Sequence, residues 1–211
     1  MTGNRHLVIF IKAPRLGRVK RRLAADIGTV AAWTFYRRTV GAVVRRLSRD
    51  PRWRTWLAVT PDAAAAQGGV WPSGGTRIPQ GTGDLGQRMF RPMRRLPPGP
   101  VVIVGTDIPE LDNRHIAAAF TALGRHDAVF GPAPDGGYWL VGLAPRVRRR
   151  EVFRRVRWST EHALADTLAS LPSTWSVKLL TPLEDVDDGA SFLRWRQRAR
   201  DAAALTRGAL A

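Results

Sequence analysis

Short apolar runs alternate with helical patterns along most of the chain, and this order limits the possible folds more than any other feature. Brief runs of β-branched and aromatic residues, bounded by Gly, Pro or Asp, predict strands. The predicted strands are residues 7–11, 55–59, 101–104, 128–130, 138–143 and 177–180. The predicted helices are residues 21–25, 30–47, 85–95, 113–123, 160–171 and 190–204. Such an alternation is typical of an α/β domain with a mostly parallel central sheet flanked by helices.

The length of 211 residues fits one domain that spans residues 1–211 and buries a substantial core. The chain contains no cysteine, which is compatible with a reducing compartment, and we expect a cytoplasmic protein. Apolar runs such as residues 7–11 are far too short to span a membrane. Lys12 follows that run too soon for a convincing secretory signal.

The net charge of +17 is unusual, and nearly all of the basic residues are arginines. A field of this size attracts nucleic acid, anionic membranes and phosphorylated small molecules. The simpler interpretation is that most of these arginines lie on solvated helix faces. A nucleic-acid-binding domain is the less favoured alternative, and it predicts a continuous basic stripe with steeply salt-dependent binding.

The residues that follow each strand are the candidates for chemistry, because open sheets of this kind bind ligands beyond the carboxyl ends of their strands. The first strand is followed by KAPRLGRVKRRL at residues 12–23, where Pro14 and Gly17 predict a loop. Backbone amides at the next helix start, with guanidinium groups, would suit a di- or triphosphate. An ordinary basic loop is the alternative. The cations of this segment are Lys12, Arg15, Arg18, Lys20, Arg21 and Arg22.

The predicted strand at residues 101–104 ends in Gly105, Thr106 and Asp107, and Pro109 follows. A carboxylate near the core needs a partner. A divalent cation such as Mg²⁺ or Mn²⁺ would serve, since it prefers carboxylate and phosphate oxygens. The alternative is that Asp107 caps a turn, or the helix that begins near Asn113.

Two further acidic segments follow predicted strands. Asp135, Gly136 and Gly137 form a turn signal, so they could simply close a hairpin, or they could line an acceptor pocket. Glu184, Asp185, Asp187 and Asp188 lie within residues 183–188 of an otherwise basic chain. These acids could cap the last helix, or one of them could complete a metal site with Asp107.

Other patterns carry less weight. GTGDLG at residues 81–86 satisfies the dinucleotide-binding pattern, but the strand predicted before it, residues 76–79, is weak and ends in proline. The four histidines show no metal-ligand spacing, and no GxSxG motif is present. The sequence therefore favours neither a Rossmann cofactor site nor a serine hydrolase.

Six motifs occur in the order KAPRLGRVKRRLA, QGTGDLGQRM, VVIVGTDIPEL, FGPAPDGGYWLVGL, RWST and LEDVDD. Together they resemble the bacterial "transferase 1" glycosyltransferase family, which is selenodomain-associated and of the GT-A type. The resemblance runs from about residue 7 to about residue 195. That family is similar in turn to 2-phospho-lactate guanylyltransferase and molybdenum-cofactor guanylyltransferase.

The resemblance implies a single GT-A, or nucleotide-diphospho-sugar transferase-like, domain and a role for each motif. Asp107 would bind the metal, and Asp187 would be a second metal ligand. Asp135 is the candidate catalytic base, with Lys20 as the catalytic cation. Nucleotide binding would fall to Ala13, Pro14, Arg15, Gly17, Lys20 and Arg22 in the first loop, and to Gln80, Gly81 and Thr82 beside the base. Asp84, Asp135, Gly136 and Gly137 would bind the substrate.

The predicted function is that of a transferase that depends on Mg²⁺ or Mn²⁺ and uses a nucleotide-activated donor. The resemblance favours transfer of a sugar from a nucleotide sugar to a small-molecule acceptor, with a possible homodimer. The alternative is nucleotidyl transfer from a nucleoside triphosphate with release of pyrophosphate. One departure from the family is Arg21, which stands where a threonine is usual and adds bulk and charge beside the phosphate site. A degenerate transferase fold that only binds a partner is a further alternative.

Overall fold

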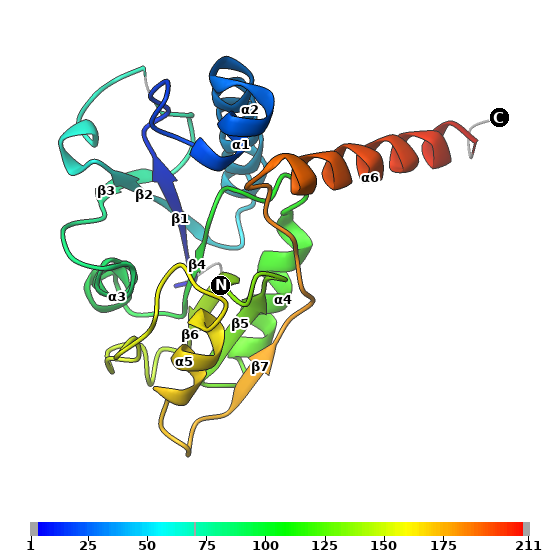
Figure 1. Cartoon of the computed structure of the whole chain (residues 1–211). Coiled ribbons are helices and arrows are strands. Elements are labelled where there is room, and N and C mark those ends of the chain that lie inside the picture. The colour runs from blue at the N-terminus through cyan, green and yellow to red at the C-terminus, as the bar shows by residue number, and fades with distance from the viewer. Residues whose placement is uncertain (1–3, 70, 209–211) are drawn as a thin grey trace.

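The computed structural model describes residues 4–69 and 71–208 (Figure 1). The described strands form one sheet in the order β3-β2-β1-β4-β6-β5-β7. The strands are β1 (His6–Lys12), β2 (Arg54–Thr60), β3 (Thr76–Pro79), β4 (Val101–Val104), β5 (Ala128–Pro132), β6 (Tyr138–Leu143) and β7 (Val177–Leu179). The helices are α1 (Arg21–Ile27), α2 (Thr29–Ser48), α3 (Leu85–Arg95), α4 (Asn113–Leu123), α5 (Ala163–Ala169) and α6 (Gly189–Gly208), with a short 3₁₀ turn at Asp62–Ala64.

Pairing within the sheet is mostly parallel. β1 pairs in parallel with both β2 and β4, β2 with β3, and β5 with β7. β6 is the exception, because it runs antiparallel to β4 and β5. The predicted fold class is confirmed: this is an α/β domain with a sheet of mostly parallel strands, flanked by helices.

The core is centred on β1 and β4. Leu7, Val8 and Ile9 are fully buried, and all four residues of β4 are buried as well. These strands read as continuous apolar runs because helices cover both faces of a parallel sheet. Their lack of polar alternation is therefore the expected sequence pattern for central strands.

Two elements differ from the sequence prediction. The weak run TRIP does form β3, which is tolerable because it pairs only with β2 at the edge of the sheet. The helix predicted at residues 160–171 is shorter, since α5 begins at Ala163. Arg157 explains this difference, because its backbone N–H and its guanidinium both donate to Asp166 and hold the preceding segment in turns.

α6 extends away from the rest of the molecule in Figure 1. Its first half contacts the rest of the chain, since Phe192 and Trp195 pack on Phe35 of α2. In addition, Arg198 pairs with Glu110. α2 and α6 are the longest described helices, yet no described helix is long and apolar enough to cross a membrane.

Candidate active site

A cleft of about 920 Å³ opens at one edge of the sheet. Its walls include the residues that follow the parallel strands, because parallel strands bring their carboxyl ends to the same edge. β6 contributes its first residues there, since it runs in the opposite direction. The charged and polar residues that line the cleft include Lys12, Arg18, Lys20, Arg21, Arg22, Gln80, Arg88, Asp107, Asp135, Asp185 and Asp187.

The segment after β1 is a loop, as predicted, and α2 holds it in place. The indole N–H of Trp33 donates to the carbonyl of Pro14 at 2.6 Å. The hydroxyl of Tyr36 donates to the carbonyl of Lys12 at 2.8 Å and accepts from its N–H at 3.0 Å. Gly17 has φ 70°, a left-handed conformation that glycine adopts readily. The loop is therefore fixed by local packing at the mouth of the cleft.

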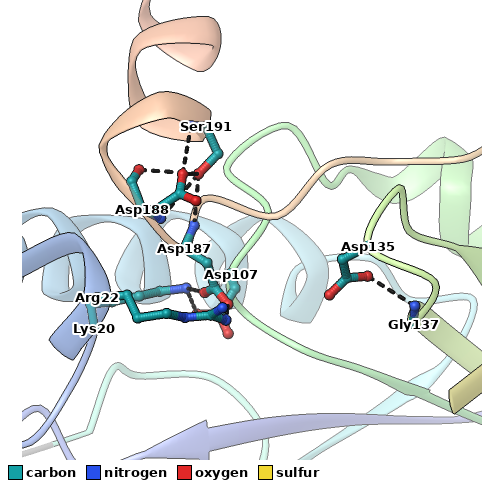
Figure 2. Close-up of polar contacts among 8 residues, drawn as sticks. All are labelled: Lys20, Arg22, Asp107, Asp135, Gly137, Asp187, Asp188 and Ser191. Carbon is teal, nitrogen blue, oxygen red and sulfur yellow. Dashed lines mark hydrogen bonds and ion pairs between the residues drawn. The ribbon is translucent and has the colours of Figure 1, made fainter. Parts of the chain in front are cut away.

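Lys20 is the central cation of the cleft. It lies just before α1 with φ 46°, a conformation that is uncommon for a residue with a side chain. Its side chain is only 5% exposed, and Nζ lies 2.8 Å from Oδ1 of Asp107 and 2.5 Å from Oδ1 of Asp187. Arg22 adds a second cation, with an Nη 2.7 Å from Oδ2 of Asp187 (Figure 2). The structure thus joins the first loop to both predicted metal ligands.

Asp107 does not cap a helix, so that alternative was wrong. α4 is instead capped by Asp112, whose carboxylate accepts from the backbone N–H groups of Arg114 and His115. Asp107 is 43% exposed at the end of β4 and reaches into the cleft. Gly105 faces open space beside it, so a ligand can approach the backbone there.

The acidic segment at residues 183–188 caps the last helix, as one alternative predicted, and a different acid of the same segment reaches the cleft. Its backbone is tied to the loop after β4, because the N–H of Val186 donates to the carbonyl of Asp107 at 2.9 Å. Asp188 caps α6 by accepting from the N–H of Ser191 at 2.8 Å (Figure 2). Asp187 points the other way, toward Lys20.

Negative charge is concentrated around Asp185. Burial, and then the charges of Asp187, Asp135 and Asp107, raise the pKa of Asp185 to about 6, while Lys20 opposes them. Burial acts on the pKa of Asp187 in the same direction, but Lys20 and then Arg22 hold that pKa below its ordinary value. Burial alone would lower the pKa of Lys20, yet Asp107 and Asp187 raise it. The surroundings of Asp185 therefore favour a nearby cation.

Asp135 lies on the other side of the cleft from this cluster. It sits in the β5–β6 hairpin turn, where Oδ1 accepts from the N–H of Gly137 at 2.9 Å (Figure 2). Gly136 has φ 81°, and a Cβ there would lie 2.0 Å from the carbonyl oxygen of Glu161. The hairpin interpretation is thus confirmed, and the same turn places Asp135 and Gly137 on the cleft wall.

The structure brings only part of the predicted site together. Seven of the predicted residues line the cleft, namely Lys20, Arg22, Gln80, Asp107, Asp135, Gly137 and Asp187. Ala13, Pro14, Arg15, Gly17, Gly81, Thr82, Asp84 and Gly136 are outside that lining. Asp84 caps α3, where its carboxylate accepts from the N–H of Gln87 at 2.8 Å. The ligand contacts predicted for these residues stay predictions.

Sequence reasoning gave Arg88 no role and did not single out Asp185 among its neighbours. Asp185 was one of four clustered acids, and nothing in the sequence shows which of these acids face the cleft. Arg88 lies within GDLGQRM, one of the motifs that carry the family resemblance, so a signal for it was present. Trp158, Ser159 and Thr160 also line the cleft, from the RWST motif.

The carboxylates fit a divalent cation that is also bound by a ligand. Asp107 and Asp187 already converge on one cationic atom, Nζ of Lys20. In residues 4–69 and 71–208, no three His, Cys, Asp or Glu side chains are arranged to hold a metal ion by themselves. Mg²⁺ is commonly bound by one or two carboxylates with substrate phosphates and water, so two converging carboxylates are a suitable donor set.

The architecture is that of nucleotide-diphospho-sugar transferase-like proteins. A crystal structure provisionally described as a nucleotide-diphospho-sugar transferase from Desulfovibrio desulfuricans G20 is 27% identical, with a TM-score of 0.79 over 87% of this chain and 82% of that one. Two other structures are a 4-diphosphocytidyl-2C-methyl-D-erythritol synthase from Anaerococcus prevotii (9% identity, TM-score 0.62) and a CMP:2-keto-3-deoxy-manno-octonic acid synthetase in complex with CTP (11%, 0.57). Each of these two matches covers 95% of this chain and 100% of the other chain.

The chain belongs to the family DUF2064, described as an uncharacterized protein conserved in bacteria, whose model matches residues 43–160. No curated protein matches the sequence. The two synthetases show the fold alone, whereas the first relative also supports a transferase that uses nucleotides. The expected GT-A-like fold is confirmed, and the narrower "transferase 1" resemblance stays a prediction.

Proposed function

We propose that this protein is a metal-dependent transferase that uses a nucleotide-activated donor and passes a glycosyl group to a small acceptor. One observation carries the proposal. Asp107 and Asp187 come from distant segments, yet both reach the ammonium group of Lys20 at the carboxyl edge of the sheet. Cations from the first loop and the start of α1 line the same cleft. Such an arrangement suits the diphosphate of an activated donor and its metal.

In this proposal Asp107 and Asp187 hold Mg²⁺ or Mn²⁺, which supplies charge neutralisation at the diphosphate. Lys20 and Arg22 share that negative charge as the nucleoside diphosphate leaves. Stabilising the charge of a leaving group is usually the largest contribution of such a site. Because Lys20 already bridges the two carboxylates, it also keeps them close together when no ligand is bound.

Asp135 is the candidate base for the acceptor. The acceptor oxygen forms a bond to the sugar carbon, the bond from that carbon to the diphosphate oxygen breaks, and the hydroxyl proton passes to the carboxylate of Asp135. The N–H of Gly137 fixes this carboxylate by bonding Oδ1, so Oδ2 is the oxygen left for the proton. Asp135 lies apart from the Lys20 cluster in Figure 2, and both line the same cleft.

A second candidate is nucleotidyl transfer, the alternative that the sequence also leaves open. There, a phosphate oxygen of the substrate attacks the α-phosphorus of a nucleoside triphosphate, and pyrophosphate leaves. The same carboxylates and cations would serve both reactions. The 27% identity of the relative described as a sugar transferase is the reason for preferring glycosyl transfer.

The test has two stages. A thermal-shift panel of nucleoside diphosphates, triphosphates and nucleotide sugars, each with and without Mn²⁺, should show stabilisation that needs both nucleotide and metal. Product analysis with the best ligand then separates the reactions, since glycosyl transfer releases a nucleoside diphosphate and nucleotidyl transfer releases pyrophosphate. Absence of any metal-dependent nucleotide binding would contradict both candidates.

A further inference from the structure

Arg88 is a cation in the cleft that has no acidic partner among the described residues. It lies on α3 and lines the cleft. One Nη donates to Oε1 of Gln80 at 3.1 Å. Among the described residues, the Arg88 side chain makes no second hydrogen bond. Its Nε is buried and has no hydrogen-bond partner there. A buried donor without a partner costs free energy. Because this donor belongs to a residue that lines the cleft, a ligand bound there could accept its hydrogen bond.

Gln80 holds this guanidinium in a defined place. Gln80 is 3% exposed, and its side-chain amide donates to the carbonyl of Ala58 at 2.8 Å. The same nitrogen lies 3.4 Å from the carbonyl of Ile11, so β1 and β2 together fix the amide. The carbonyl oxygen of the amide is then directed at Arg88. Gln80 is therefore a positioning residue for Arg88 in this structure.

The neighbouring arginine on α3 behaves differently. Arg91 donates to the backbone carbonyls of Gln80 and Thr82, so it stabilises the loop before α3. Arg95 is exposed on the same helix, outside the cleft lining. Of these three arginines only Arg88 lines the cleft.

The helix that carries Arg88, α3, packs on an aromatic wall made of Phe153, Trp158 and Tyr138. At Gly86, a Cβ would lie 2.6 Å from Cβ of Phe153 and 2.7 Å from Cζ2 of Trp158, so α3 is in direct contact with this wall. Trp158 and Tyr138 line the cleft, as Arg88 does, and their rings are 6.4 Å apart. Figure 1 shows α3 well apart from the start of α1, the helix that follows Lys20. Arg88 and Lys20 therefore reach the cleft from separate elements.

We propose that Arg88, positioned by Gln80, binds a phosphate or carboxylate group of a small molecule where α3 lines the cleft. A guanidinium offers parallel N–H donors that match the oxygens of such a group, and Nε is one of these donors. The anion can belong to the donor or to the acceptor. The inference rests on the proposed function only in taking this cleft as the substrate site.

The experiment is calorimetric titration of the full chain. In one arm, nucleoside diphosphates with Mg²⁺ are titrated into the wild type, Arg88→Gln and Arg95→Gln. In the other arm, inorganic phosphate is titrated into the same proteins saturated with Mg²⁺ and the nucleoside diphosphate that binds. Arg88→Gln should weaken binding at least about tenfold in one arm, because a charged hydrogen bond is lost. Arg95→Gln is the matched control, and its affinities should stay within about twofold of the wild type.

A loss in the nucleotide arm assigns the anion to the donor, and a loss in the phosphate arm assigns it to the acceptor. Equal affinities for Arg88→Gln and Arg95→Gln in both arms would overturn the proposal. If no nucleotide binds even the wild type, the proposed function fails, and phosphate titrated into the ligand-free proteins still tests Arg88 by the same comparison.

A stability measurement separates ligand binding from a structural role. Arg88→Met removes the unpartnered Nε and fills similar space, so its melting temperature without ligand should equal or exceed that of the wild type. Lower stability together with unchanged phosphate and nucleotide affinity would show that Arg88 only supports the fold, which contradicts the proposal.

Discussion

The segment at residues 183–188 presents acids to two environments. On its outer side, Glu184 contacts α6, with Oε1 2.6 Å from Arg194 and Oε2 2.8 Å from Arg198. On its inner side, Asp187 contacts Lys20, and Asp185 lines the cleft. Neighbouring acids of one short segment thus face solvent-exposed arginines in one direction and a partly buried cluster of carboxylates in the other.

The difference shows how burial and charge balance separate structural from functional acids. The hydrogen bonds of Arg194 lower the pKa of Glu184, against a small opposing effect of burial. Exposed ion pairs of this kind contribute little to stability. By contrast, burial raises the pKa of Asp185, and three neighbouring carboxylates add to that effect. The outer group is electrostatically satisfied, whereas the inner group favours a further cation.

The largest expected effect is that of Asp107→Asn, which removes the carboxylate that meets Asp187 at Lys20 and so tests whether these two acids bind the metal. We expect transferase activity to fall by about 10²-fold or more, because a neutral amide holds a divalent cation and its diphosphate poorly. The Mn²⁺-dependent thermal shift with nucleotide should disappear as well. Glu184→Gln is the control, since it removes the same charge from the outer side and should keep both. Equal losses in the two variants would remove the distinction between the two sides.

A smaller effect, a gain in stability, is expected from Asp185→Asn. The pKa of Asp185, about 6, is above that of an unfolded carboxyl group. Protonated Asp185 therefore contributes to the free energy of unfolding fully below about pH 4, and this contribution is lost as the pH rises through 6. The variant stays neutral and should be more stable than the wild type at pH 8, by about 1 kcal/mol. Urea unfolding at pH 8 and pH 4 measures the difference, which should vanish at pH 4. A variant less stable at pH 8 would contradict the concentration of negative charge around Asp185.

The smallest effect is expected for the stability of Glu184→Gln. Because the pKa of Glu184 is lowered, its contribution is present above the pKa of an unfolded glutamate and is lost as the pH falls through the folded value. We expect a loss of about 0.5 kcal/mol at pH 7, typical of exposed ion pairs. The loss should shrink in high salt and at pH 3 in the same urea measurements. A loss several times larger would mean that Glu184 anchors α6 more firmly than its exposure suggests.

Much of the site was predictable because it follows from strand ends. The apolar run of β4 ends in Asp107, and parallel strands bring such residues to one edge with the loop after β1. The contact of Lys20 with Asp107 fulfils that expectation. The role of Asp84 was harder to foresee, since Asp84 and Gln87 belong to the motif GDLGQRM and also form the capping box of α3.

The alternating elements, the apolar central strands and the acids and arginines that follow them could be predicted, because they depend on local patterns of hydrophobicity and turn residues. The fold was needed to show which acid of residues 183–188 meets Lys20. It was also needed to show that Arg88 lines the cleft with a buried Nε that has no partner among the described residues. The direction of a side chain in an irregular segment, and the burial that shifts its pKa, depend on contacts between segments far apart in the chain. No local pattern encodes those contacts.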